Sequence, residues 1–468
     1  LKYLGVEFVA GQAGGWAPIG AEAAAGGGYN VAWKVAGADQ YTVWRADSGG
    51  NYASSVVGVV SGGSYVLQAL EAQFAQDLNG DGTLGVAMTQ IEAFGATSLS
   101  AGASRYFLGS GGTPGPMLKY LGVEFVEGQA GGWAPIGAEA VAGGGYNVAW
   151  KVTGADQYTV WRADSGGNYA SSLVGLVSGG SYALQLLEAQ FAQDLNRDGT
   201  IGVSLTQIEA FGATSLSAGA SRYFLGSGGA PGPTLKYLGM DLIAGQAGGW
   251  APIGAEAVAG GGYNVTWKTA GADQYTVWNA DSSGNYVSSR VGVVSGGSYA
   301  LQSLETIFAQ DLNSDGTMGP VTSQIEAAGA TGLVKQADLY FVESGGAVGP
   351  SLKYLGAAVT AGSLGGWAPI GAEAAAGGGY NVVWKMAGAD QYTVWNADSS
   401  GNYASSLVGV VSGGSYALQE LEGRFAQDLN GDGTIGLTAV QIETVGATSL
   451  IRKADRYFLE DGGTPGPT

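Results

Sequence analysis

One unit of 117 residues fills the chain four times, and this period constrains the fold more than any other feature of the sequence. The segment Leu-Lys-Tyr-Leu-Gly opens every copy, at Leu1, Leu118, Leu235 and Leu352. Such a tandem repeat predicts equivalent modules that contact their neighbours, rather than one core for the whole chain. We expect four repeats arranged in a linear array, covering residues 1–117, 118–234, 235–351 and 352–468.

Each repeat begins with the alternation of apolar and polar residues that is typical of β-strands. In the first copy Tyr29, Val31 and Trp33 lie on one face of a predicted strand, and a glycine turn leads to the next strand at residues 41–44. Helical spacing follows, at Leu67, Leu70, Phe74 and Leu78. The expected fold class is a β-rich α+β repeat, in which each copy has an antiparallel sheet, one amphipathic helix and an EF-hand-like loop.

The end of the repeat leaves the folding phase open. Residues 89–92 suggest a short second helix, residues 105–108 read as a strand, and the Pro- and Gly-rich joint 111–116 leads into the next copy. If the joint is a linker, each copy is a self-contained domain. If it is a tight connection, the strand 105–108 pairs with residues 118–121, and residues near 86–117 complete the following copy. Residues 456–459 would then be free to complete the first copy of another molecule by β-strand addition.

An Asp-x-Asn-x-Asp-Gly-Thr motif follows the predicted helix in every copy. This pattern opens EF-hand calcium loops, with side-chain oxygens at positions 1, 3 and 5, a glycine at position 6 and a backbone carbonyl at position 7. The sequence therefore predicts about one Ca²⁺ per repeat, and the alternative is an Asx/Gly turn that holds no ion. The predicted ligands are Asp77, Asn79, Asp81 and Thr83; Asp194, Asn196, Asp198 and Thr200; Asp311, Asn313, Asp315 and Thr317; and Asp428, Asn430, Asp432 and Thr434.

Position 12 of the loop departs from the EF-hand pattern. The bidentate carboxylate expected there is replaced by Met88, Leu205, Thr322 or Ala439. A carboxylate lies four residues later in each copy and would close the shell if the chain leaves the loop differently from an EF-hand. These additional candidate ligands are Glu92, Glu209, Glu326 and Glu443.

Composition excludes several partners and chemistries. The net charge is −19, with 19 basic and 38 acidic residues, so a nucleic acid is not an expected partner. No apolar stretch is long enough to insert in a membrane. The chain has no cysteine and no histidine, which leaves oxygen ligands and hard cations. An acidic, glycine-rich, cysteine-free chain is typical of extracellular or cell-surface bacterial proteins.

Recurring aromatic and acidic residues are further candidates for binding or catalytic groups. Trp16, Trp33 and Trp44 have equivalents in every copy, and exposed indoles stack on sugar rings, but a small sheet also needs large side chains for its core. Glu22 and Asp39 also recur, yet no nucleophile–base constellation accompanies them. We therefore expect that the protein is not an enzyme.

The blocks Gly-Gly-Trp-Ala-Pro-Ile-Gly-Ala-Glu (14–22), Tyr-Asn-Val-Ala-Trp-Lys (29–34), Ala-Asp-Gln-Tyr-Thr-Val-Trp (38–44) and 74–85 recur in all four copies. With these blocks the repeat resembles the tryptophan-rich C-terminal domain family of cyanobacterial and other bacterial proteins. The resemblance implies large secreted repeat proteins, often beside calcium-binding repeats, and no assigned activity. The loop alone is similar to half of a dockerin, but dockerins pair two such loops in one short module, so cohesin binding is not implied.

These features predict an extracellular, calcium-stabilised structural repeat protein that forms a surface filament or an adhesin stalk. Its expected partners are copies of itself, and head-to-tail β-strand addition is one way in which they would join. The alternative is a multivalent array of carbohydrate-binding modules, whose partners would be glycans. Burial separates the two, because sugar binding needs at least two of the three tryptophans on a solvent-facing platform.

Overall fold

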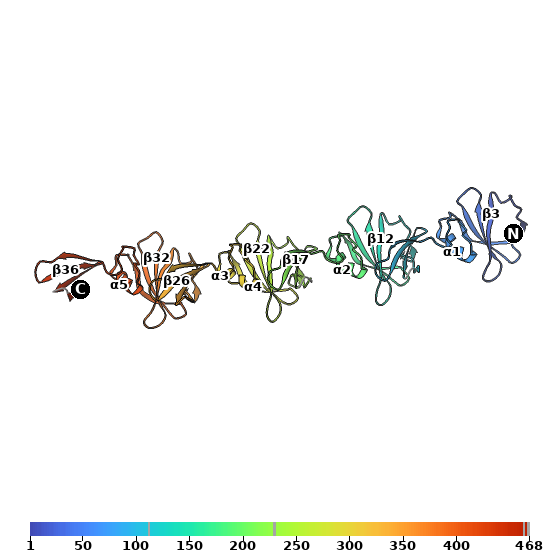
Figure 1. Cartoon of the computed structure of the whole chain (residues 1–468). Coiled ribbons are helices and arrows are strands. Elements are labelled where there is room, and N and C mark those ends of the chain that lie inside the picture. The colour runs from blue at the N-terminus through green and yellow to red at the C-terminus, as the bar shows by residue number, and fades with distance from the viewer. Residues whose placement is uncertain (111–112, 228–230, 462–463, 466–468) are drawn as a thin grey trace. The chain divides into compact units, whose positions relative to one another are not determined.

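The computed structural model describes residues 1–110, 113–227, 231–461 and 464–465 (Figure 1). Gly111 and Gly112 of the predicted joint lie outside the described residues. The chain divides into two compact units, Leu1–Leu205 and Thr206–Thr468, which are described separately below. Both units are built from the same parts, which recur with the sequence period.

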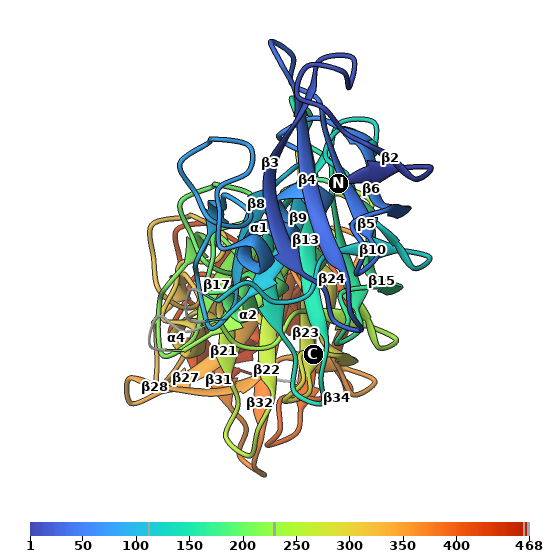
Figure 2. The same ribbon diagram turned by 90° about the vertical axis from the view of Figure 1, so that its right-hand side faces the viewer.

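The first part is a four-stranded antiparallel meander, in which each strand pairs with the next along the chain (Figure 2). Tyr, Val, Trp and Thr dominate its inner strands, as expected for a half-buried pleated surface. A β-bulge interrupts its first strand between Pro18 and Gly20, since proline cannot donate to the ladder. In unit 1 the strands are β3 (Trp16–Ala23), β4 (Tyr29–Val35), β5 (Tyr41–Ala46), β6 (Tyr52–Val60), β12 (Trp133–Ala140), β13 (Tyr146–Val152), β14 (Tyr158–Ala163) and β15 (Tyr169–Val177). In unit 2 they are β21 (Trp250–Ala257), β22 (Tyr263–Thr269), β23 (Tyr275–Ala280), β24 (Tyr286–Val294), β31 (Trp367–Ala374), β32 (Tyr380–Met386), β33 (Tyr392–Ala397) and β34 (Tyr403–Val411).

A helical segment follows each meander. It comprises α1 (Tyr65–Phe74), α2 (Tyr182–Phe191) and α5 (Tyr416–Phe425), and in the third repeat two short pieces, α3 (Tyr299–Gln302) and α4 (Glu305–Phe308). The prediction of one amphipathic helix per copy is therefore wrong for the third repeat, where Ser303 and Leu304 separate the two pieces. In the first repeat α1 ends at Ala75, whose φ of 45° turns the chain into the acidic loop.

Another antiparallel sheet follows each loop. Its first strand, β7 (Thr89–Glu92), replaces the short helix expected there, because the β-branched Thr89 and Ile91 extend along β8 (Ser98–Gly102). β8 pairs in turn with β9 (Arg105–Gly109). The equivalent sheets of the second, third and fourth repeats are β16 (Thr206–Glu209), β17 (Ser215–Gly219) and β18 (Arg222–Gly226); β25 (Thr322–Glu326), β26 (Thr331–Gln336), β27 (Leu339–Ser344) and β28 (Ala347–Ser351); and β35 (Ala439–Glu443), β36 (Thr448–Lys453), β37 (Arg456–Asp461) and β38 (Thr464–Pro465).

Short two-stranded hairpins open the repeats and lie against the meanders. Lys2, for example, forms a parallel bridge with Asn51. These hairpins are β1 (Lys2–Tyr3) with β2 (Val6–Glu7), β10 (Lys119–Tyr120) with β11 (Val123–Glu124), β19 (Lys236–Tyr237) with β20 (Met240–Asp241), and β29 (Lys353–Tyr354) with β30 (Ala357–Ala358). None of the helices among the described residues is long and apolar enough to cross a membrane.

The sheet β7–β9 packs on the meander of the following repeat. The Leu118 backbone N–H donates to the Tyr106 carbonyl at 2.9 Å, and the Leu108 N–H donates to the Pro116 carbonyl at 2.9 Å. The strand 105–109 thus meets residues 116–118, whereas residues 119–120 belong to a hairpin. One hydrophobic cluster joins the two copies: Leu99, Tyr106, Leu108, Leu118, Ala138, Val148, Trp150 and Ala163.

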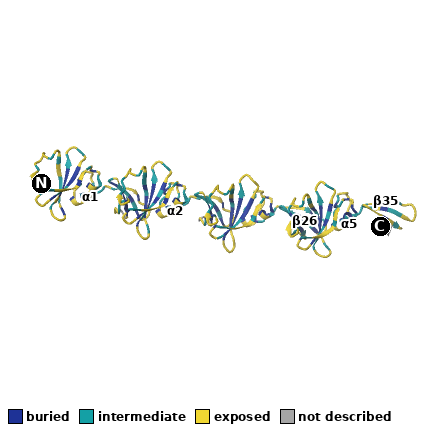
Figure 3. Cartoon of the chain, turned by 180° about the vertical axis from the view of Figure 1, so that it is seen from behind, coloured by how far each residue is buried: buried dark blue, intermediate teal, exposed yellow. Residues whose placement is uncertain are grey.

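The opposite face of each meander packs on the helix, so a complete module has three layers. In the second repeat Val160, Leu184 and Phe191 belong to the cluster between sheet and helix. Burial on both faces explains why Val148, Ala149 and Trp150 are buried in succession along β13. Figure 3 shows this burial as dark strands between exposed loops. Unit 2 contains two further joints of the same kind, with clusters around Leu216 and Leu333.

Candidate functional site

The acidic loop is held closed by its own side chains. The Asp77 carboxylate accepts backbone N–H bonds from Gly80 at 2.7 Å and from Gly82 at 2.8 Å. The Asp81 carboxylate accepts the Thr83 N–H at 2.8 Å and the Asn79 side-chain amide at 2.9 Å. The structure therefore brings together the first, third and fifth predicted ligands of the loop, and the same bonds recur in the other copies.

A buried glutamate anchors this loop to the helix. Glu71 of α1 is fully buried, and its carboxylate accepts the backbone N–H groups of Leu78 at 3.0 Å and Gly85 at 2.9 Å, at the two ends of the loop. Sequence reasoning missed this residue. The available signal was an acid on the apolar helix face, between Leu67 and Phe74, in every copy: Glu71, Glu188, Glu305 and Glu422.

The loop meets part of what calcium requires. Its donors are oxygens, which Ca²⁺ prefers, and a carboxylate oxygen that accepts one N–H keeps a lone pair for a cation. Within the described ranges, however, no three acidic side chains converge as a metal group. The residues that fit are the two aspartates, the asparagine and the backbone carbonyl of Thr83, with no carboxylate of the loop at position 12.

The second set of predicted ligands lies in the joints instead. The Glu92 carboxylate accepts the Phe94 N–H at 2.9 Å and, in the following repeat, the Ala138 N–H at 3.0 Å. Glu209 and Glu326 bond Ala255 and Ala372 in the same way. Glu443 accepts the N–H of Val445. These carboxylates are engaged away from the loop because β7 extends from it as a strand rather than turning back.

Each joint pairs two buried carboxyl groups. Opposite Glu92 lies Glu139 of β12, which accepts the Ala96 N–H at 3.1 Å; both side chains are 5 % exposed. A Cβ on Gly95 would overlap the Glu139 carboxylate, and Gly95 has a φ of 66°, so the turn requires glycine. Burial raises the pKa of both carboxyls above the ordinary 4.5, and the charge of Glu139 raises the pKa of Glu92 further.

The raised pKa values predict that the joints become more stable as the solution is acidified. A carboxyl with a raised folded-state pKa contributes stability that is fully present below its ordinary pKa and is lost as the pH rises through the raised value. The free energy of unfolding should therefore increase as the pH is lowered towards the ordinary carboxyl pKa of 4.5. Exposed aspartates with lowered pKa values, such as Asp77, oppose this only at lower pH.

Denaturant titrations at several pH values measure this effect. Glu139→Gln and Glu256→Gln should flatten the pH dependence, because each removes one carboxyl from a joint. Glu420→Gln is the control, since Glu420 is an exposed residue of α5 and lies in no joint. Equal pH dependence in the joint variants and the control would contradict the assignment.

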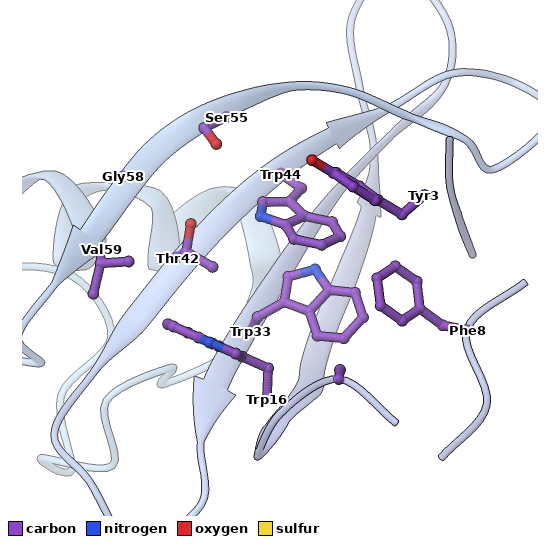
Figure 4. A pocket seen from close by; sticks show the side chains of 10 residues that line it. Tyr3, Phe8, Trp16, Trp33, Thr42, Trp44, Ser55, Gly58 and Val59 are labelled. Carbon is purple, nitrogen blue, oxygen red and sulfur yellow. The ribbon is translucent and has the colours of Figure 1, made fainter. Parts of the chain in front are cut away.

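An aromatic pocket lies on the face of the meander that bears the tryptophans. In the first repeat it has a volume of about 470 Å³ and is lined by Trp16, Trp33 and Trp44 with Tyr3 and Phe8 (Figure 4). Trp33 is buried, and its ring centroid lies 4.8 Å from that of Trp44. Trp16 and Trp44 are half-buried. Comparable pockets occur beside Trp161 and Trp395.

The buried indole on this face of each meander carries a donor without a partner. The Nε1 atoms concerned belong to Trp33, Trp150, Trp267 and Trp384, and none has a hydrogen-bond partner among the described residues.

The remaining acidic candidates, Glu22 and Asp39, lie at opposite ends of β4. Glu22 pairs with Asn30 at one end, while Asp39 follows the other end and accepts the Gly62 N–H at 2.9 Å. The structure does not bring Glu22 and Asp39 together.

Comparison with known proteins identifies one family. The sequence model described as "Tryptophan-rich Synechocystis species C-terminal domain" matches residues 1–85, 97–202, 214–319 and 331–436. The last three ranges start within or just before the middle strand of a joint sheet and end just beyond the acidic loop that follows. No curated protein sequence matches the chain.

Two solved structures show remote likenesses to the chain. Prolyl oligopeptidase B from Galerina marginata is 9 % identical, with a TM-score of 0.15 and coverage of 83 % of this chain and 48 % of that one. A post-proline cleaving enzyme from Rickettsia typhi is 6 % identical, with a TM-score of 0.15 and coverage of 81 % and 49 %. The chain spans about half the length of these enzymes, and TM-scores this low carry no argument about fold or activity.

Proposed function

The chain belongs to the family of tryptophan-rich Synechocystis species C-terminal domains, and from this premise we propose that it is an extracellular structural protein of a bacterial surface, stabilised by calcium. It would serve as a filament segment or an adhesin stalk. Its four tandem modules set a length rather than an active site. The proposal includes no enzymatic activity.

The observation that carries the proposal is the joint between repeats. Leu99 and Leu108 of one repeat are buried against Val148 and Trp150 of the next, with hydrogen bonds between backbone and carboxylate across the boundary. Successive repeats therefore share hydrophobic cores instead of hanging on linkers. Shared cores resist separation of neighbours under load, which suits a stalk or filament. The net charge of −19 also argues against nucleic acid as a partner.

Calcium would act at the acidic loops. Asp77, Asn79, Asp81 and the Thr83 carbonyl would hold the ion in the first copy, and water would complete the shell. Glu71 would keep the loop ends in place through its backbone bonds. An ion that binds only the folded loop stabilises the fold by mass action, by about 2.7 kcal/mol per site at a concentration 100 times the Kd.

Thermal unfolding with calcium or with a chelator tests the calcium proposal. We expect millimolar Ca²⁺ to raise the Tm of the wild-type chain and to have no effect when Asp77, Asp194, Asp311 and Asp428 are replaced by alanine. The matched control replaces Asp47, Asp164, Asp281 and Asp398, which cap exposed turns in the same four copies. If calcium does not change the Tm of the wild-type chain, the proposal that calcium stabilises the acidic loops is wrong.

The aromatic pocket supports a second candidate, an array of four glycan-binding modules. Two half-buried indole walls, Trp16 and Trp44, are suited to stacking on the apolar face of a sugar ring. Replacing Trp44, Trp161, Trp278 and Trp395 by phenylalanine should weaken oligosaccharide binding at least about fivefold per site in a chain that remains folded. No binding of a broad panel of oligosaccharides to the wild-type chain in calorimetry would exclude this function.

A further inference from the structure

Each joint has a donor half, the sheet that ends one repeat, and an acceptor half, the meander that begins the next. One half of each kind is exposed in this chain. In the donor sheet β35–β37, Tyr457 is 59 % exposed and Leu459 is 49 % exposed, whereas their counterparts Tyr106 and Leu108 in the first joint are 4 % and 0 % exposed. The C-terminal sheet thus presents to solvent the side chains that the internal joints bury.

The first meander presents the matching acceptor half. Leu1 is 46 % exposed, while its counterpart Leu118 is 2 % exposed. Ala21 is exposed on β3, and its counterpart Ala138 is buried with its N–H bonded to Glu92. The occupant that fits this face is already seated three times on equivalent faces of the same chain.

Charge complementarity distinguishes the two exposed halves from a generic apolar patch. Arg105 and Glu124 form an ion pair across the first joint at 2.6 Å, and Arg222 and Asp241 form one at 2.8 Å. The third joint has Leu339 and Ala358 at these positions. The exposed donor half carries Arg456, and the exposed acceptor half carries Glu7, so the two halves match the first two joints.

The polar bonds of the joint can also be reproduced. Glu443 occupies the position of Glu92 and would accept the Ala21 N–H. Glu22 occupies the position of Glu139 and would accept the Ala447 N–H, as Glu139 does from Ala96. The Ala140 N–H of the first joint also donates to the Thr97 hydroxyl at 2.9 Å, and Ala23 and Thr448 occupy these two positions in the exposed halves.

We propose that the sheet β35–β37 of one copy docks on the meander β3–β6 of a second copy, and that the chain thereby assembles head to tail through a fourth joint. This inference deepens the proposed structural function and rests on it. The docked element is a preformed sheet that covers a face, rather than the single added strand that the sequence suggested. The expected ion pair is Arg456 with Glu7 of the second copy.

Sedimentation velocity of the full chain over a range of concentrations tests the proposal. We expect a ladder of oligomers that shifts to monomer in the Leu459→Asp variant, with at least a 30-fold weaker association, as for an interface hot spot. The control is Val410→Asp, at a residue of β34 that is 61 % exposed and whose counterparts are exposed in every repeat. A wild-type chain that stays monomeric, or association that Leu459→Asp leaves unchanged, would overturn the proposal.

Mixing two blocked chains tests direction. Leu459→Asp leaves only an acceptor half, and Ala21→Glu, which places a carboxylate against Glu443, leaves only a donor half. Each variant alone should be monomeric, and an equimolar mixture should stop at heterodimers. Oligomers larger than heterodimers in the mixture, or a mixture that stays monomeric, would overturn head-to-tail docking. Arg456→Glu should weaken association, and Glu7→Arg in the same chain should restore it.

The experiments distinguish a failure of the docking proposal from a failure of the proposal that calcium stabilises the acidic loops. The docking halves contain none of the loop aspartates, so the chain with all four loop substitutions should still associate while it remains folded. If the wild-type chain associates but its Tm does not depend on calcium, the calcium proposal is wrong and the docking proposal stands. If its Tm depends on calcium but the chain is always monomeric, the docking proposal is wrong and the calcium proposal stands.

Discussion

A fragment of residues 86–202 should be more stable than a fragment of residues 118–234, by at least about 3 kcal/mol, although both contain 117 residues. The first keeps β7–β9 together with the meander on which they pack. The second follows the sequence period and separates both sheets from their partners. In the second fragment Leu118, Tyr223 and Leu225 lose the partners that bury them in the whole chain, and burial of one such side chain is worth about 1.5–3 kcal/mol.

Denaturant unfolding of the two fragments, followed by tryptophan fluorescence, gives the comparison. The 86–202 fragment, which keeps the joint, should unfold in one transition and stay monomeric. The 118–234 fragment should show a lower midpoint, and dilution should separate any self-association from its intrinsic stability. Equal stability of the two fragments as monomers would show that the joint contributes nothing to folding.

Replacing Glu188 by alanine should destabilise the 86–202 fragment by about 3–5 kcal/mol. Glu188 is fully buried, and its carboxylate accepts the N–H groups of Leu195 at 3.0 Å, Asn196 at 3.3 Å and Gly202 at 2.9 Å. Alanine leaves these donors without an acceptor and also opens a cavity beneath the loop. The effect should greatly exceed that of a surface change on the same helix.

Two variants make the measurement specific. Glu188→Gln keeps one acceptor oxygen and should lose less stability than Glu188→Ala. Gln190→Ala, at an exposed position of α2, should change the free energy of unfolding by less than about 0.5 kcal/mol. If Glu188→Ala cost no more than Gln190→Ala, the anchoring role of the glutamate would be wrong.

The sequence predicted the strands and most of the helix because their periods are local properties. It could not give the phase of the fold, since a repeated sequence has the same period wherever the unit is cut. One sign was present: Val148, Ala149 and Trp150 are all apolar in succession, which indicates a strand covered on both faces. Nothing in the sequence specified that the second cover comes from the repeat before.

The candidate site was predictable in part for a similar reason. Asp77, Asn79 and Asp81 lie within five residues, so their proximity follows from the loop itself. Glu92 is close to the loop in sequence, but an extended strand carries it to the next repeat. Glu71 bonds both ends of the loop, but it lies on the helix before the loop and outside the motif, so the spacing of the motif does not indicate it. The spacing of residues in the sequence therefore failed to predict the contacts that depend on tertiary folding.

The offset joint bears on how such a chain changes length over generations. A duplication of one whole period adds one complete joint wherever its endpoints fall, because each period contains one donor and one acceptor half. Unequal recombination between copies can therefore lengthen or shorten the protein without the invention of a new contact. An insertion or deletion that is not a whole period would leave two halves mismatched, so selection acts on the count of repeats in integer steps.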